Sequence, residues 1–342
     1  MHTTTKPSRW SRRAVMGWGV AAGLAGLARA AAADWPLVGS DPARGPAVPD
    51  VPARRFSEHV WGVIAREAMP TEDNLGLFTN SYFIITRKGV VVYDTGASMQ
   101  IGEMLIRQLR RITSKPVVAV INSHWHGDHW LGNQAFVEAF GRDLPIYALR
   151  GCREGTQGAI GEEWVRRLTQ WTNQAIRGTQ AVPPNRDLEH GQVLDFGDVR
   201  LRAHHYTPCH TPYDLSMEVI GEGVTLIGDV ATNRRISNME DGSFEGAIEY
   251  MKRIEAQTRT RLWCSGHGEP DASQVRWNRT LFEGIWEAAL EAAKDAAGPE
   301  QAKALALRHP KVVATRPGTI GFAANIGKFC SLAYLEAEKK AF

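Results

Sequence analysis

The sequence predicts an α/β protein, and two observations carry the prediction. Apolar runs of strand length alternate with segments of helical spacing from about residue 58 to residue 150. A second series of apolar runs begins after residue 187, and its later members end in small polar segments. Strands that alternate with helices along a chain are typical of sheets covered by helices. Residues 276–342 favour helix, so we expect a helical C-terminal extension.

The first predicted elements are strands. Residues 59–65 form one apolar run, and residues 77–86 and 89–96 form two more, which a Lys-Gly turn separates as in a hairpin. The elements that follow alternate: a helix over 101–113, a strand over 116–123, a helix over 129–141 and a strand over 144–148. In the first of these helices the apolar residues fall on one side, namely Ile101, Met104, Leu105, Leu109 and Ile112.

Residues 151–187 interrupt this alternation. Trp164, Leu168 and Trp171 have helical spacing, which predicts a helix over 161–178. This helix either packs on the body of the protein or forms a lid over a site. The elements expected after it are a hairpin over 191–207, strands over 223–229 and 260–268, and a helix over 281–297.

The first 33 residues have the pattern of an export signal. They contain five basic residues and no acidic one, and an apolar segment rich in Ala and Gly leads to a junction after Ala33. Arg12 and Arg13 resemble a twin-arginine signal. The apolar segment is too short for a permanent membrane span. We therefore expect a periplasmic or secreted protein with no stable membrane span after removal of the signal, and an irregular lead-in over residues 34–57.

The charge balance of the remaining chain is compatible with a small-molecule function but argues against nucleic-acid binding. The whole chain has a balance of +3. Without the five basic residues of the export signal, 35 basic and 37 acidic residues remain. A chain that is slightly acidic lacks the overall positive charge that nucleic-acid binding requires. The expected partner is a small-molecule substrate, and no pattern indicates an oligomeric state.

The stretch "NSHWHGDHW", residues 122–130, concentrates groups that bind metals. His124 and His126 are two residues apart, so in an extended segment their side chains point the same way. Gly127 permits a change of direction, and Asp128 and His129 then begin the next predicted helix. This spacing suits two metal ions side by side, one bound by two imidazoles and the other by a carboxylate and an imidazole.

Three later residues supply the ligands that such a pair of sites still needs. His210, Asp229 and His267 each follow an apolar run that we predict to be a strand. Ligand sites of α/β sheets gather at the ends of strands. A catalytic zinc ion takes three protein ligands and keeps one open position. The sequence therefore predicts that these three residues join the cluster around His124.

The order H-x-H-x-D-H, then His, Asp and His, resembles the metallo-β-lactamase-fold hydrolase superfamily over about residues 58–275. The run "VVVYDTG", which contains Asp94, is similar to a strand that lies beneath the metals in that family. The resemblance implies a four-layer αβ/βα sandwich as the catalytic domain, residues 58–275. It also implies a dinuclear centre that holds two Zn²⁺ ions, or iron.

The resemblance further implies a role for each residue of the pattern. One metal would be held by His124, His126 and His210, and the other by Asp128, His129 and His267. Asp229 would bridge the metals, and Asp94 would orient a ligand histidine. A hydroxide shared by the metals would attack the substrate, while Asp128 and Asp229 fix the metals and take the proton.

Asp229 favours the glyoxalase-II-like branch and its exported relatives over the true β-lactamases, whose pattern lacks this aspartate. The expected reaction is hydrolysis of an ester, a thioester, a lactone or a related bond. Cys209 and Pro212 depart from the glycines that the family often has near His210. Cys209 and Cys264 are either buried apolar residues, a disulfide or functional thiols.

Substrate contacts are predicted only from proximity in the sequence. Asn80, Tyr206 and Tyr213 are candidate donors to an oxyanion, with ordinary packing as the alternative. Arg234 and Arg235 are candidates to bind an anionic group of the substrate, with a solvated pair as the alternative.

Three other functions compete with the hydrolase. A persulfide-dioxygenase-like enzyme would hold one iron through His124, His210 and Asp229. A true β-lactamase is the second alternative. A periplasmic metal-binding protein without turnover is the third, and the complete set of ligands argues against it.

Overall fold

The computed structural model describes residues 44–341. The export signal predicted over residues 1–33 and the start of the lead-in lie outside the described residues. None of the helices in the described part of the chain combines the length and the apolar character that a membrane crossing requires.

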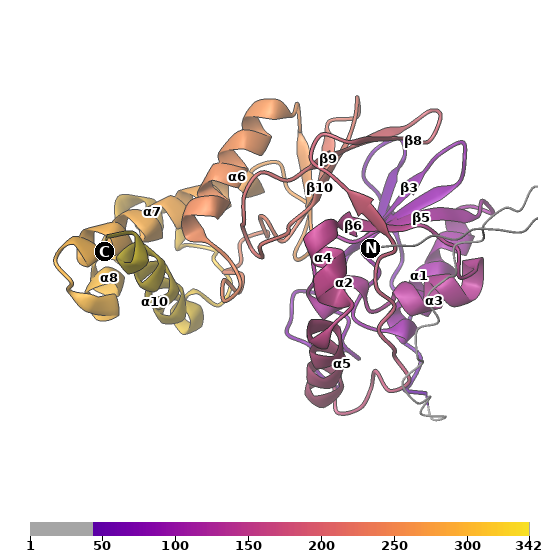
Figure 1. Cartoon of the computed structure of the whole chain (residues 1–342), viewed down its shortest axis with the longest axis horizontal. Coiled ribbons are helices and arrows are strands. Elements are labelled where there is room, and N and C mark those ends of the chain that lie inside the picture. Colours follow the sequence, from indigo (N-terminus) through magenta and orange to yellow (C-terminus); the bar gives the residue numbers. More distant parts are fainter. Residues whose placement is uncertain (1–43, 342) are drawn as a thin grey trace, which may run out of the picture. The chain divides into compact units, whose positions relative to one another are not determined.

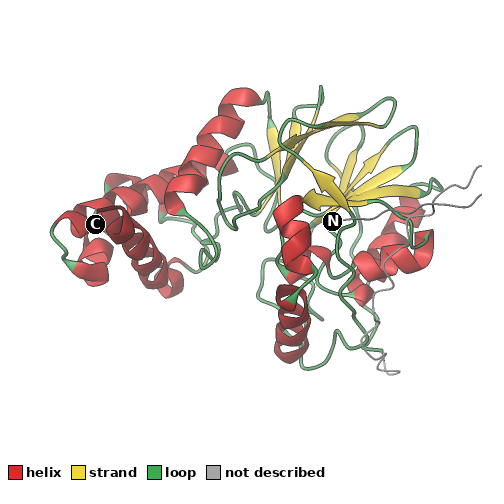
Figure 2. Cartoon of the chain, viewed as in Figure 1, coloured by secondary structure: helices red, strands yellow, loops and turns green. Residues whose placement is uncertain are grey.

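Two mixed sheets form the centre of the fold (Figures 1 and 2). The first sheet has the strand order β1 to β7, antiparallel from β1 to β4 and parallel from β4 to β7. Its strands are β1 (Arg54–Arg55), β2 (Val60–Val63), β3 (Ser81–Ile85), β4 (Val90–Tyr93), β5 (Val117–Ile121), β6 (Ile146–Leu149) and β7 (Arg186–Leu188).

The second sheet has the order β12-β11-β10-β9-β8. Only the pair β11–β12 is parallel. Its strands are β8 (Val193–Asp195), β9 (Arg200–His204), β10 (Ser216–Val219), β11 (Val224–Gly228) and β12 (Leu262–Ser265). The strands predicted from the apolar runs are therefore present in both sheets.

Three apolar cores separate four layers. Successive side chains of a strand point to opposite faces, and β4 illustrates this. Val90 and Val92 pack in the core beneath α1, α3 and α5, whereas Val91 and Tyr93 pack in the core between the two sheets. The other face of the second sheet packs on α6 and the C-terminal helices. This order of helix, sheet, sheet and helix confirms the predicted αβ/βα sandwich.

The helices of the first half begin at α1 (Met99–Ile112), whose N-cap residue Ser98 accepts a hydrogen bond from the Ile101 backbone. The others are α2 (Gly127–Trp130), α3 (Asn133–Phe140), α4 (Arg150–Thr156) and α5 (Ala159–Trp171). The prediction of a single helix over 129–141 is wrong, because the helix is interrupted at Gly132, between α2 and α3. A Cβ atom on Gly132 would lie 2.0 Å from the Thr95 carbonyl oxygen, so the backbone passes too closely there for a side chain.

The helix predicted over 161–178 is shorter than expected. It ends at Trp171, because Asn173 and Gln174 adopt φ angles of 46° and 70°. A right-handed helix cannot continue through that region of backbone conformation. The prediction also omitted α6 (Phe244–Gln257) and strand β10.

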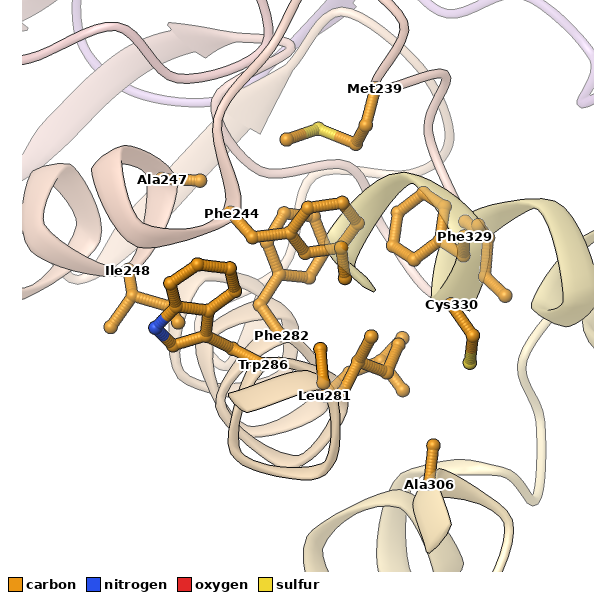
Figure 3. Packing of buried hydrophobic residues seen from close by; sticks show 14 of the residues in the cluster. Met239, Phe244, Ala247, Ile248, Leu281, Phe282, Trp286, Ala306, Phe329 and Cys330 are labelled. Atoms are coloured by element: carbon orange, nitrogen blue, oxygen red, sulfur yellow. The ribbon is translucent and has the colours of Figure 1, made fainter. Parts of the chain in front are cut away.

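The C-terminal helices are α7 (Gln274–Lys294), α8 (Gly298–Ala306), α9 (Pro310–Thr315) and α10 (Phe322–Ala341). They share one apolar core with α6, in which the rings of Phe244, Phe282 and Phe329 are 4.9 to 5.5 Å apart (Figure 3). The carboxylate of Glu336 on α10 accepts hydrogen bonds from Ser243 Oγ and the Phe244 backbone at the start of α6.

Candidate metal centre

The predicted ligands lie where strands end. His124 and His126 follow β5, and Asp128 and His129 lie on the short helix α2. Gly127 is required at the start of α2, since a Cβ atom there would lie 2.6 Å from the Trp164 Cβ atom. The close approach of α5 thus fixes the turn in which the chain changes direction between the two pairs of ligands.

The second sheet brings the other three residues to the same place. His210 lies after β9, Asp229 directly after β11 and His267 after β12. Gly266 precedes His267, and a Cβ atom on it would lie 2.3 Å from Asp229 Oδ1. Any larger residue at that position would therefore push the carboxylate out of the cluster.

The structure brings all seven predicted residues into one buried cluster. Their donor atoms form three overlapping groups, each with its atoms within 4.8 Å of one another: His124, His126 and His210; His124, His129 and Asp229; and Asp128, His129 and His267. Asp229 lies between the first and last groups. Its Oδ2 atom is 3.6 Å from His210 Nε2 and 3.3 Å from His267 Nε2.

Several donor atoms of the cluster lack the partners that burial demands. His124 Nε2, His129 Nε2 and Asp229 Oδ1 have no hydrogen-bond partner among residues 44–341. A buried polar atom without a partner is costly, and a divalent cation satisfies imidazole and carboxylate donors together. The cluster of nitrogen and oxygen donors therefore fits divalent metal binding.

Burial and neighbouring charges set the protonation of the imidazoles. Burial, followed by the nearby His126, lowers the pKa of His210 to about 3. Burial also lowers the pKa of His124 well below its usual value. Both rings are therefore neutral near pH 7, which is the form that binds a metal.

His129 and His267 behave differently because carboxylates surround them. Burial opposes the charged form of His129, but Asp128 and Asp229 outweigh it and raise its pKa well above the usual value. For His267 the same balance of burial against Asp229 raises the pKa to about 9. The two imidazoles nearest the carboxylates thus carry protons that a metal would displace.

Asp94 and Ser123 contact two histidines of the cluster and orient their rings. Asp94 Oδ2 lies 2.8 Å from His129 Nδ1, and Asp94 Oδ1 accepts a hydrogen bond from the Ser123 backbone. Ser123 Oγ in turn lies 2.9 Å from His124 Nδ1. Burial raises the pKa of Asp94, and the adjacent His129 opposes this shift. These contacts leave Nε2 of both histidines directed to the cluster.

Three further contacts were not predicted from the sequence. His126 Nε2 lies 3.0 Å from Asp241 Oδ2, and His267 Nδ1 lies 2.9 Å from the Phe78 carbonyl oxygen. Thr79 Oγ1 donates to Asp128 Oδ2 at 2.7 Å. These residues lie in loops without a metal-binding pattern: Phe78 and Thr79 were predicted to belong to a strand, and Asp241 lies before the helix α6, which was not predicted.

The centre lies at the bottom of a cavity of about 1120 Å³. We call its metal-binding side the floor, formed by His126, Asp128, His210, Asp229 and His267. We call its apolar sides the walls; their main residues are Met69, Trp164, Trp171, Ile320, Phe329 and Leu332. Residues 151–187 therefore contribute a wall through α5, which also packs on the body through the buried Leu168.

Of the predicted substrate contacts, only Arg235 lines the cavity, and its guanidinium lies 3.2 Å from the Glu67 carboxylate. Arg234 instead stacks over the Trp277 ring at 5.3 Å. Asn80 donates to the carbonyls of Ser265 and Gly268 and so joins two loops.

The two tyrosines also have other partners. Tyr206 contacts His204 Nδ1 at 2.8 Å and donates to Gln257, and the ring of Tyr213 packs against Trp125 at 5.7 Å. Neither tyrosine lines the cavity. The packing that the sequence offered as the alternative is what the structure contains at these positions.

The cysteines near the centre are not paired. Cys209 and Cys264 are both free and buried. Burial raises the pKa of each thiol. They therefore match the alternative of buried apolar residues rather than a disulfide or a reactive thiolate.

Comparison with known sequences identifies the family. The sequence profile of the metallo-beta-lactamase superfamily matches residues 75–309. The chain belongs to the metallo-beta-lactamase superfamily. This confirms the resemblance drawn from the histidine and aspartate pattern. The match also extends into the helices α7 and α8, beyond the boundary at residue 275 that the sequence predicted.

Two curated proteins are similar to this superfamily member over different lengths. The linear primary-alkylsulfatase of Pseudomonas sp. (strain ATCC 19151) is 36% identical over 78 residues, which cover 21% of this chain and 15% of that protein. The atrochrysone carboxyl ACP thioesterase of Passalora fulva is 25% identical over 239 residues, which cover 68% of this chain and 59% of that protein. The chain thus spans less than two thirds of either relative.

Solved structures share the fold. A metallo-beta-lactamase from Pontibacter korlensis superposes with a TM-score of 0.53 at 16% identity, over 68% of this chain and 98% of that one. A double mutant of the sec-alkyl sulfatase PisA1 superposes with a TM-score of 0.60 at 17% identity, over 74% of this chain and 45% of that one. At these identities the likeness concerns the fold alone.

Proposed function

We propose that this protein is a metal-dependent hydrolase that uses two divalent metal ions, zinc in the first instance, to cleave an ester, a thioester or a related bond of a small molecule. The observation that carries the proposal is the set of three overlapping donor groups at the floor of an open cavity. The names of the two curated relatives, a sulfatase and a thioesterase, support the same class of reaction.

The donor groups divide the ligands between two metals. His124, His126 and His210 would hold one ion, and Asp128, His129 and His267 the other. Asp229 faces both groups and would bridge them. When bound, such metals supply a Lewis acid for the substrate oxygen and lower the pKa of a water molecule towards 7.

The residues of the chain hold the reacting groups and receive the proton. Asp94 and Ser123 orient His129 and His124, so that Nε2 of each ring points to the cluster. We assign Asp128 and Asp229 as acceptors of the proton that the attacking water loses. Thr79 keeps Asp128 in place through the hydrogen bond to its Oδ2 atom.

A complete second donor group argues against a single iron. A persulfide-dioxygenase-like site would need only His124, His210 and Asp229. The group of Asp128, His129 and His267 is equally buried and compact. The shared aspartate, Asp229, likewise supports the glyoxalase-II-like branch over a true β-lactamase. We further propose that the protein is exported to the periplasm by the twin-arginine signal in residues 1–33.

The test is metal analysis and a hydrolysis panel on the same preparation of the full chain. Bound metal is counted by elemental analysis, and the panel contains p-nitrophenyl esters, an acyl thioester, a lactone, an alkyl sulfate and a β-lactam. We expect two metal ions per chain and metal-dependent turnover of an ester-type substrate. One iron with oxygen uptake, or two metals without turnover of any substrate, would overturn the proposal.

A further inference from the structure

The walls of the cavity carry apolar side chains that are unusually exposed. Seven large apolar residues within residues 44–341 are classed as exposed, and three of them line this cavity: Met69 at 61%, Trp171 at 44% and Ile320 at 49% exposed. They come from separate parts of the chain. Apolar groups that converge in this way on a concave surface mark a binding site rather than chance exposure.

We call these three exposed residues the rim. Aromatic and aliphatic side chains continue the walls from the rim towards the floor. Trp164 and Trp171 of α5 are in edge contact, with ring centroids 6.2 Å apart, and the Trp164 ring lies tilted against the His126 ring at 4.9 Å. Phe329 and Leu332 of α10 line the same cavity. An apolar surface therefore continues from the rim at Trp171 down to a residue of the floor.

The charged groups of the walls are already paired. Arg167 lies 2.6 Å from Glu163, and Lys328 lies 2.6 Å from Glu240. Arg235 has Glu67 as its partner. Among the described residues, each lysine or arginine that lines the cavity thus has an acidic partner. The walls favour an apolar group over an anionic one, which differs from the anion-binding role predicted for Arg234 and Arg235.

The cavity is larger than a compact substrate would fill. Small-molecule pockets have volumes of roughly 300–1,000 Å³, and this cavity has about 1120 Å³. A short acyl group bound at the floor would leave Trp171 and Ile320 in contact with water. A long chain would cover them and would gain the free energy of burial along its whole length.

We propose that the substrate carries a long aliphatic chain on the bond that is cleaved, and that this chain lies along the walls formed by α5 and α10. This inference rests on the proposed function, because it names the substrate class of the same site. Hydrolysis of such an ester adds the hydroxyl of one water to the acyl carbon, breaks the bond from that carbon to oxygen and passes the proton to the departing alcohol.

Binding of an aliphatic chain is measured without turnover. Neutral bromoalcohols, 6-bromohexanol and 12-bromododecanol, are titrated below their aggregation concentrations into the full chain as purified with its bound metal, and tryptophan fluorescence is recorded. Burial of one methylene is worth ~0.8 kcal/mol, or about a fourfold change in affinity. We expect saturable quenching and at least about sixtyfold tighter binding of the longer alcohol, which corresponds to burial of three of its six additional methylenes. Quenching that does not saturate, or equal affinity for both alcohols, would overturn the inference.

Matched variants test where on the protein the aliphatic chain of the ligand binds. Trp171→Gln and Ile320→Gln change exposed residues of the walls. Val313→Gln and Leu335→Gln change residues that are 52% and 50% exposed but do not line the cavity. We expect the first pair to weaken 12-bromododecanol binding about fivefold to tenfold each and the second pair to leave the midpoint unchanged. Equal effects of the two pairs would place the aliphatic chain of the ligand outside the walls of the cavity and overturn the inference.

Turnover of p-nitrophenyl esters with acyl chains from C2 to C12 separates the two proposals. We expect kcat/KM to rise with chain length, mainly through KM. Hydrolysis without a preference for long chains, together with no saturable binding, would contradict this inference and leave the proposed function standing. Saturable binding of the bromoalcohol without turnover of any substrate of the hydrolysis panel would contradict the proposed function and leave the site for the aliphatic chain standing.

Discussion

The floor and the walls of the cavity are built in opposite ways. The floor consists of buried histidines and aspartates that follow strand ends, and further contacts hold several of them, such as the Phe78 carbonyl oxygen beside His267 and Thr79 beside Asp128. The walls consist of apolar side chains on helices, several of them exposed. Buried donor groups that their neighbours hold in position suit a metal centre, in which a small displacement is costly. Exposed apolar helices suit recognition of a chain, in which each contact adds a small amount.

On the proposed function, the chemistry of the protein resides in the floor and its substrate specificity in the walls. Substitutions in the floor should change metal binding and turnover of every substrate alike. Substitutions in the walls should change the preference among substrates and leave the metals in place. The following predictions test that separation, beginning with the largest effect on metal binding.

Asp229→Ala should have the largest effect. It removes the carboxylate that faces both donor groups, so we expect loss of metal and a fall in turnover beyond the ten- to hundredfold typical of residues that only orient a ligand. Metal content and kcat are measured on the same sample. Asp295→Ala, at the end of α7, is the control and should retain both. A variant with two metals and full rate would show that Asp229 is not a ligand.

Asp94→Asn should lower metal affinity about tenfold to a hundredfold. The side chain lies beneath His129 and Ser123, and its loss of charge weakens the orientation of both. Asp94 has φ near 57°, a conformation that asparagine also accepts, so the backbone should stay in place. Competition with a chromogenic chelator measures the change, and an unchanged affinity would contradict the role.

Asp241→Asn should have a smaller effect, about threefold to tenfold in metal affinity, below the range for buried orienting residues. The carboxylate contacts His126 Nε2, but its side chain is 47% exposed. Water therefore takes over part of the interaction. The same chelator competition gives the value. A loss as large as that of Asp94→Asn would mean that exposure does not weaken this contact.

Trp171→Gln should leave metal binding unchanged, which is the smallest effect of the four substitutions. The residue belongs to the rim of the walls and contacts none of the ligands among the described residues. Metal content and the unfolding midpoint should match those of the unchanged protein. A loss of metal in this variant would show that the walls and the floor are not separate.

The sequence was sufficient to predict that the seven candidate ligands lie close together, because they follow a local rule. Four of them lie within residues 124–129, and His210, Asp229 and His267 each follow an apolar run. Strand ends meet at one edge of a sheet, so their meeting could be expected. The fold class followed from the same alternation of strands and helices.

The walls could not be derived in this way. Met69, Trp171 and Ile320 meet only because distant loops and helices pack against the same cavity, and no periodicity of the sequence specifies that packing. The contact of Asp241 with His126 also depends on the path of the loop before α6, a helix that was not predicted. Its signal was present in Ser243, which caps the helix, and in the spacing of Phe244 and Ile248.

The carboxylate of Glu336 connects helix α10 to the candidate metal centre through the loop that precedes α6. It binds Ser243 and Phe244 at the start of α6, two residues after Asp241, which contacts His126. We therefore expect ordering of α10 and orientation of His126 to be coupled, and such coupling is reciprocal. Binding of metal should slow amide hydrogen exchange in α10, and local unfolding of α10 should speed the release of the metal.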